Sequence, residues 1–156
     1  MAKYIKALCF LFIVSGLTTN LSAQSVYADN ETNSTSITCL GCTVTDPGFA
    51  VDGDESTAST LNAYLGLLGG SVEQTLIFPS AGQAGDTVEI MMESGELLLS
   101  LNLLGNVGVT SFNGASSNND TKIASDQSVS VLGNNKFLFT FYPSAAYDRV
   151  QIKMTV

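Results

Sequence analysis

The chain has 156 residues, with 14 Asp and Glu against six Lys and Arg, and it contains no histidine and no tryptophan. Its length suits one domain of ordinary size. Without histidine, neither a Ser-His-Asp arrangement nor a His-ligated metal site can be assembled. The net charge of −8 argues against binding to nucleic acid or to an anionic membrane surface, because both would repel the chain.

The first 23 residues have the three parts of a secretory signal peptide. Lys3 and Lys6 form the charged start, Ala7–Leu17 is an apolar run, and cleavage is expected at Ala23–Gln24. Eleven helical residues span about 16 Å, roughly half of a bilayer core, so we expect export without membrane insertion. The mature protein would keep 133 residues with a net charge of −10, and would be secreted or held at the cell surface.

The segment Gln24–Thr38 is rich in Ser, Thr and Asn, which predicts a flexible leader before a single domain at 39–156. That domain opens with the sequence Cys-Leu-Gly-Cys. Because export implies an oxidising compartment, we expect a disulfide between Cys39 and Cys42. A thioredoxin-like redox motif would need a surrounding βαβ pattern, and a zinc half-site would need a second pair of ligands. The sequence provides neither.

From about Ile37 onward the hydrophobic period is two residues, which is typical of strands with one buried face. The pattern is clearest in 149–156, where four apolar residues alternate with Arg, Gln, Lys and Thr. Turn sequences rich in Gly and Asn separate such runs. Eight strands are predicted, including a weak first one: 41–44, 71–78, 86–92, 97–104, 107–112, 127–132, 136–142 and 149–156.

Eight short strands without a helical period predict an all-β fold. An antiparallel β-sandwich of jelly-roll type suits this number of strands best, and a closed barrel is the alternative. The segment 97–104 carries six leucines and is apolar on both faces in places. It is either a central strand covered on each side or a segment that exposes leucines to a partner.

The segment Ala50–Thr57 reads Ala-Val-Asp-Gly-Asp-Glu-Ser-Thr. It resembles a loop that many members of the discoidin, or coagulation-factor type C, family of galactose-binding-like jelly rolls carry early in the domain. Three later segments look similar to the following strand, the mid-domain strand and turn, and the closing strand of that family: Ser71–Phe78, Val109–Gly114 and Tyr147–Ile152. The resemblance spans about 41–156 and implies a ligand-binding jelly roll.

The resemblance also implies a structural Ca²⁺ in this loop. Asp52, Asp54, the hydroxyl of Ser56 or Thr57 and backbone carbonyls would supply the oxygen atoms that a hard cation requires, and Gly53 permits a sharp turn between them. The spacing is not that of an EF-hand. The alternative is a solvated acidic turn whose aspartates cap backbone amides. The residues alone leave both interpretations open.

Sugar-binding members of the family use aromatic and charged side chains, so the resemblance points to Tyr64, Tyr147 and Arg149 as candidate ligand-binding residues. Arg149 is the only arginine in the chain, and its alternative role is an ion pair with a neighbouring carboxylate on the outer sheet face. The alternative role of the tyrosines is to anchor loops through their hydroxyls.

Glycoside hydrolysis needs paired carboxylates. Glu89, Glu93 and Glu96 are of the right type, but we expect Glu89 on an outer sheet face and the other two at a hairpin tip, where solvated carboxylates are poor general acids. The sequence therefore predicts a secreted, non-catalytic module that binds a glycan or cell-surface polymer through loops of a calcium-braced sandwich. The alternative is a structural or adhesive surface protein that acts through a protein partner or self-association.

Overall fold

The structure is a computed structural model that describes residues 25–63, 65–66, 69–93, 105–124, 129–133 and 136–156. Within these ranges the chain forms antiparallel strands and one short 3-10 helix, which confirms the all-β prediction. The described part contains no helix long and apolar enough to cross a membrane. The elements are β1 (Asn30–Thr35), β2 (Cys39–Leu40), β3 (Thr43–Thr45), η1 (Pro47–Ala50), β4 (Thr60–Asn62), β5 (Leu65–Gly66), β6 (Ser71–Gly82), β7 (Val88–Glu93), β8 (Val107–Asn113), β9 (Ser116–Ser117), β10 (Lys122–Ile123), β11 (Val129–Gly133), β12 (Lys136–Phe141) and β13 (Tyr147–Thr155).

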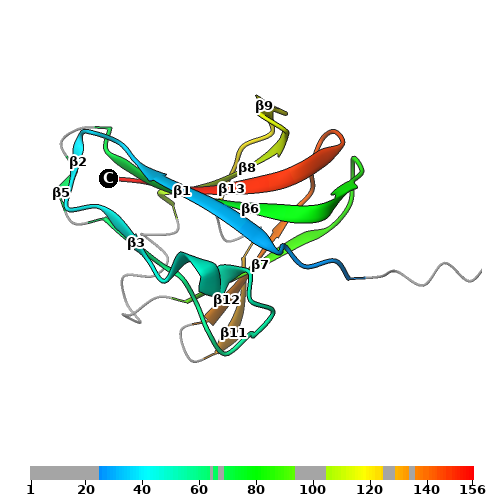
Figure 1. The fold of residues 1–156 in the computed structure, drawn as a ribbon, viewed down its shortest axis with the longest axis horizontal. Coiled ribbons are helices and arrows are strands. Elements are labelled where there is room, and N and C mark those ends of the chain that lie inside the picture. Colours follow the sequence, from blue (N-terminus) through cyan, green and yellow to red (C-terminus); the bar gives the residue numbers. More distant parts are fainter. Residues whose placement is uncertain (1–24, 64, 67–68, 94–104, 125–128, 134–135) are drawn as a thin grey trace, which may run out of the picture.

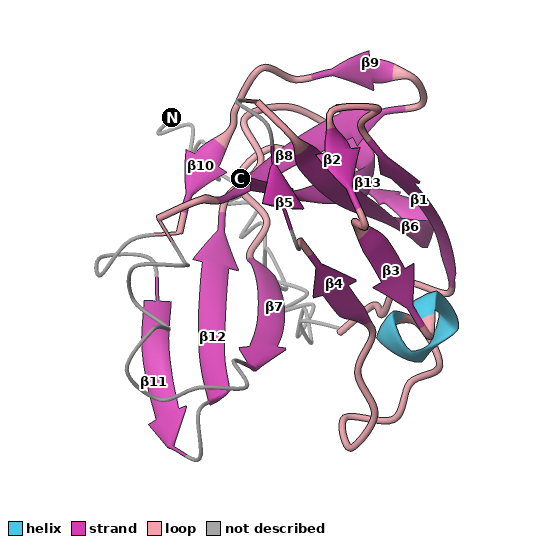
Figure 2. Cartoon of the chain, turned by 90° about the vertical axis from the view of Figure 1, so that its left-hand side faces the viewer, coloured by secondary structure: helices cyan, strands magenta, loops and turns pink. Residues whose placement is uncertain are grey.

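Two sheets make up most of the fold (Figures 1 and 2). The six-stranded sheet has the order β1-β6-β13-β8-β10, and β9 also pairs with β8. The three-stranded sheet has the order β11-β12-β7. Two small two-stranded sheets, β2 with β5 and β3 with β4, lie beside them. Neighbouring strands are antiparallel in every described pair, and several pairs, such as β6 with β13, join segments that are far apart in the sequence.

The main hydrophobic core lies between the two larger sheets. In β12 the residues Phe137, Phe139 and Phe141 are buried and alternate with half-buried side chains, as the two-residue period predicts. They share one buried cluster with Val109 of β8 and Val150 of β13. Because the inner faces of both sheets contribute to this cluster, the architecture is a β-sandwich. Its jelly-roll connectivity stays a prediction.

The N-terminal region differs from the prediction. Residues 30–35, expected within a flexible leader, form β1 and pair with β6 in a continuous antiparallel register from Asn30 opposite Ile77 to Thr35 opposite Val72. Five of the six side chains of β1 are exposed, and all six are polar. A strand at the edge of a sheet needs no hydrophobic alternation, so the pattern that marks the other strands is missing here.

Strand β6 also differs, because it continues to Gly82 and includes Pro79, which was expected to end it. The register between β6 and β13 shifts between Tyr147 and Arg149, opposite the proline. A proline is tolerated at such an irregularity because its missing N–H does not break a regular ladder. The short strands β2, β4, β5, β9 and β10 were not predicted, since two or three residues give no readable period. The predicted strand 97–104 lies outside the described residues.

Candidate functional site

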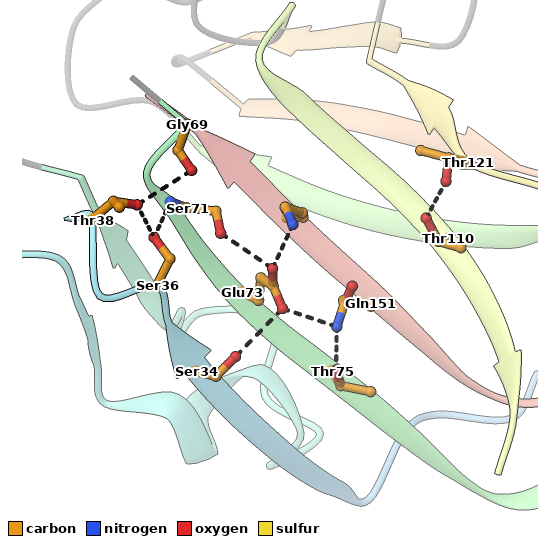
Figure 3. Close-up of polar contacts among 11 residues, drawn as sticks. Ser34, Ser36, Thr38, Gly69, Ser71, Glu73, Thr75, Thr110, Thr121 and Gln151 are labelled. Carbon is orange, nitrogen blue, oxygen red and sulfur yellow. Dashed lines mark hydrogen bonds and ion pairs between the residues drawn. The ribbon is translucent and has the colours of Figure 1, made fainter. Parts of the chain in front are cut away.

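The outer face of the six-stranded sheet is polar, and strand pairing aligns its side chains in rows across the strands (Figure 3). Residues two apart on one strand point to the same face, so each row takes every second residue. One row joins Ser34, Glu73, Lys153 and Gly108. The next row joins Thr32, Thr75, Gln151 and Thr110.

A groove of about 350 Å³ runs along β8 on this face. Its volume lies within the range of about 300–1,000 Å³ that is typical of small-molecule sites. The side chains around it are mainly hydroxyls and amides, with one lysine, one phenylalanine and one isoleucine. The groove is lined by Asn106, Gly108, Thr110, Phe112, Ser117, Thr121, Ile123, Gln151, Lys153 and Thr155.

The groove owes its depth to a glycine in the middle of β8. Gly108 has no side chain, and Thr121 and Ile123 from the β10 region lean over it. A Cβ at position 108 would lie 3.3 Å from the Thr121 methyl group and 3.4 Å from Ile123 Cδ1. Any larger side chain would therefore fill the floor and push the β10 wall outward. Thr110 joins the floor to this wall by a hydroxyl–hydroxyl bond of 2.7 Å to Thr121.

Glu73 organises the opposite wall of the groove (Figure 3). Its carboxylate accepts hydrogen bonds from Ser34 Oγ at 3.4 Å, Ser71 Oγ at 3.2 Å and the amide of Gln151 at 3.3 Å. Its Oε1 also lies 2.8 Å from Lys153 Nζ. One carboxylate thus orients Gln151 and Lys153, the two side chains of β13 nearest the centre of the groove.

The β10 wall is tied down by Asp120, which precedes Thr121. Asp120 Oδ1 accepts the backbone N–H of Ser111 at 2.9 Å, while Oδ2 accepts the Ser111 hydroxyl at 2.6 Å and the Ser144 N–H at 2.9 Å. Partial burial opposes ionisation, but the hydrogen bonds from Ser111 and Ser144 outweigh it and lower the pKa of Asp120. Asn118 adds a bond of 2.8 Å to the same Ser111 hydroxyl.

The Asp-Gly-Asp loop is exposed, and its two carboxylates accept hydrogen bonds from N–H and hydroxyl groups of the same loop. Asp52 accepts the Asp54 N–H at 2.9 Å and the Thr57 hydroxyl at 2.8 Å. Asp54 accepts the Ser56 N–H at 2.8 Å and its hydroxyl at 2.6 Å, and these bonds lower the pKa of Asp54. Gly53 takes the left-handed φ of 77° that the turn requires. These contacts are those of an acidic turn with capped amides.

A resident calcium ion would need six to eight oxygen ligands. The four residues predicted as ligands instead satisfy one another, through the hydrogen bonds of the loop. Across the described ranges, no group of three or more His, Cys, Asp and Glu side chains could hold a metal ion. A structural calcium ion in this loop stays a prediction.

Tyr147, predicted as a sugar-binding residue, lies in the core. It is 6% exposed, and its ring packs edge-to-face on Phe78 with a centroid distance of 5.7 Å. A Cβ built at Gly82 would overlap this ring, which therefore requires glycine at that position. Burial, and then the nearby charge of Asp86, raise the pKa of the Tyr147 hydroxyl. A ring held in this way cannot stack on a surface ligand, so the predicted role of Tyr147 is wrong.

Arg149 lies on the outer face, in the row of β8 residue Phe112. Its guanidinium donates two hydrogen bonds to Asp148, at 2.9 Å and 2.8 Å. The hydrogen bond from Arg149 is the main cause that lowers the pKa of Asp148 to about 2. This is the ion pair that the sequence analysis gave as the alternative to ligand binding. Arg149 does not line the groove.

The remaining predicted residues have different outcomes. Cys39 and Cys42 are buried and joined by a disulfide with a Cα–Cα distance of 5.5 Å, as predicted. Their small cluster packs with Val72 beneath the start of β6. Tyr64 lies outside the described residues. Glu89 is on the exposed face of β7, as expected.

Sequence reasoning missed the groove. The outward residues of β8 and β13 were readable from their alternation, but their meeting depends on β13 lying between β6 and β8. Comparisons with known proteins do not add to the geometry: no protein-family model, no curated protein and no solved structure matches this chain.

Proposed function

We propose that this chain is an exported, non-catalytic binding module that recognises a glycan or a cell-surface polymer through the groove along β8. The observation that carries this proposal is the lining of the groove, where hydroxyls and amides surround the half-buried ring of Phe112. Sugar hydroxyls both donate and accept hydrogen bonds, so such side chains suit them. The apolar face of a sugar ring can pack against Phe112 and Ile123.

This proposal moves the binding surface from the loops, where the resemblance put it, to a sheet face. A rigid sheet holds side chains more precisely than loops do. The residues that line the groove include no Asp or Glu, so its described lining does not supply the pair of carboxylates that glycoside hydrolysis needs. The signal-like start of the chain and the disulfide support export into an oxidising compartment.

A glycan array probed with the purified protein tests the proposal, followed by titration calorimetry on the saccharides that bind. Phe112→Ala removes the apolar platform, and Gly108→Ala narrows the floor toward Thr121. Each change should weaken binding about tenfold or more, which corresponds to about 1.4 kcal/mol. Thr32→Ala is the matched control, because Thr32 lies on the same outer face but on β1 and outside the groove. Equal affinities for all three variants would refute the groove as the site.

A second candidate function is a structural or adhesive protein that acts through protein contacts. It is favoured by the apolar side chains that the three-stranded sheet exposes, with Val131 at 69%, Leu132 at 52% and Met91 at 44%. Concentration-dependent association in analytical ultracentrifugation, together with no saccharide bound on the array, would favour this function over the first.

A further inference from the structure

Both cationic side chains of β13 are neutralised by carboxylates of the same sheet. Lys153 Nζ lies 2.8 Å from Glu73, and the Arg149 guanidinium lies 2.8 Å from Asp148. Lys153 is the single charged residue among those that line the groove. A groove used for anionic ligands would be expected to present an unpaired cation, as Lys and Arg do in phosphate and carboxylate sites.

We propose that the groove selects uncharged glycans over acidic ones, and that Glu73 sets this selectivity by neutralising Lys153. This inference rests on the proposed function and names its ligand class. Specificity often depends on an element that disfavours the wrong ligand, and not only on contacts with the right one. Here the disfavouring element is a fixed carboxylate just behind the one lysine that a uronate or sulfate group could approach.

The burial of the two partners supports this role. The Glu73 side chain is 20% exposed, whereas the Lys153 side chain is 48% exposed. An anion that approached Lys153 would have to compete with a carboxylate already 2.8 Å away. Its own charge would also come close to Glu73, and like charges repel more strongly where water is partly excluded. The net charge of −8 adds repulsion at longer range.

Glu73 also gives the groove its neutral polar contact. The amide nitrogen of Gln151 faces Glu73 at 3.3 Å and Thr75 at 3.5 Å. Figure 3 shows the amide oxygen of Gln151 pointing away from both. The carboxylate therefore orients an amide acceptor for a sugar hydroxyl while it neutralises the lysine. Glu73 is a positioning residue, since it acts through Gln151 and Lys153.

The test compares neutral and acidic versions of one backbone, hydroxyethyl cellulose and carboxymethyl cellulose, together with the neutral and uronate-bearing oligosaccharides of the array. Affinity electrophoresis and calorimetry give the ratio of the two affinities. Wild type should bind the neutral member about tenfold or more tightly. Glu73→Gln keeps a hydrogen-bonding side chain but frees the lysine charge, and should lower this ratio at least fivefold. Its gain on acidic probes should disappear at high salt, because exposed charges are then screened.

Glu89→Gln is the matched control, since it removes the same charge from the exposed face of β7 and should leave the ratio unchanged. Adding Lys153→Met to Glu73→Gln should restore the wild-type ratio. The selectivity is refuted if wild type binds the acidic members as tightly as the neutral ones, a result that needs no variant to fold. The role of Glu73 is refuted if Glu73→Gln and Glu89→Gln give the same ratio. Binding of no glycan by wild type would refute the proposed function itself, and the inference with it.

Discussion

Replacing Asp120 by alanine should destabilise the protein and loosen the groove together. Ser111 is fully buried, and both its N–H and its hydroxyl donate to Asp120. Leaving a buried donor without an acceptor costs about 1–3 kcal/mol. Two such donors give about 2–6 kcal/mol. The bond to the exposed Ser144 adds little to this cost, because water can replace it. In a domain of this size, about 3 kcal/mol corresponds to a fall of roughly 10 °C in melting temperature.

The measurement is thermal and urea unfolding followed by circular dichroism, with Asp86→Ala as the control. Asp86 accepts one hydrogen bond, of 2.7 Å, from the Gln83 N–H in an exposed turn, so its loss should cost less than about 1 kcal/mol. The same Asp120 variant should bind the saccharide identified on the array more weakly, because Thr121 loses its anchored neighbour. If Asp120→Ala and Asp86→Ala melt within about 2 °C of each other, the role assigned to the Ser111 contacts is incorrect.

Three further predictions follow from the contacts described above. Gly82→Ala should lower the melting temperature by several degrees, because a Cβ at this position would overlap the Tyr147 ring. A crystal structure of the variant should show the ring displaced. An unchanged melting curve would contradict this packing. The pKa of Asp120 is lowered in the folded state, so its ionised carboxylate stabilises the fold above its ordinary pKa near 4, and this stability is lost as the pH falls further. Between about pH 4 and pH 2, the free energy of unfolding should therefore fall more for wild type than for Asp120→Asn. Parallel curves of unfolding free energy against pH would contradict this role of Asp120. EDTA should leave the melting temperatures of wild type and of the variant Asp52→Asn, Asp54→Asn unchanged, because Asp52 and Asp54 already accept hydrogen bonds from donors of the same loop. A fall in melting temperature confined to wild type would show that the loop binds a cation.

The strands with one buried face could be predicted from sequence. In β12 and β13 the hydrophobic effect favours an apolar side chain at every second position, so the pattern is visible without a structure. Strand β1 could not be predicted, since an edge strand with exposed polar side chains is stabilised by its ladder to β6 rather than by its composition. A proline usually ends a strand, so the sequence predicts that β6 stops before Pro79. The irregular register opposite Pro79 leaves no signal in the sequence.

The candidate site was less predictable than the fold. Tyr147 was selected for its chemistry, but its place in the core depends on Phe78 and Gly82, which come together only after the strands pair. The groove residues Gly108 and Gln151 have no distinctive sequence motif. They become neighbours through the order of strands in the sheet, and a two-residue period shows which face a side chain occupies without showing what lies beside it.

The central position of β13 has a consequence for how the chain acquires its structure. Gln151 meets Glu73 across 78 residues of sequence, so the entropy of closing a long loop is lost before the middle of the sheet gains any stability. Until β13 arrives, β6 and β8 each present an unpaired edge, which is the surface through which partly folded chains associate. We therefore expect slow, cooperative refolding, with aggregation when the process is interrupted, and a strong benefit from a chaperone that shields strand edges.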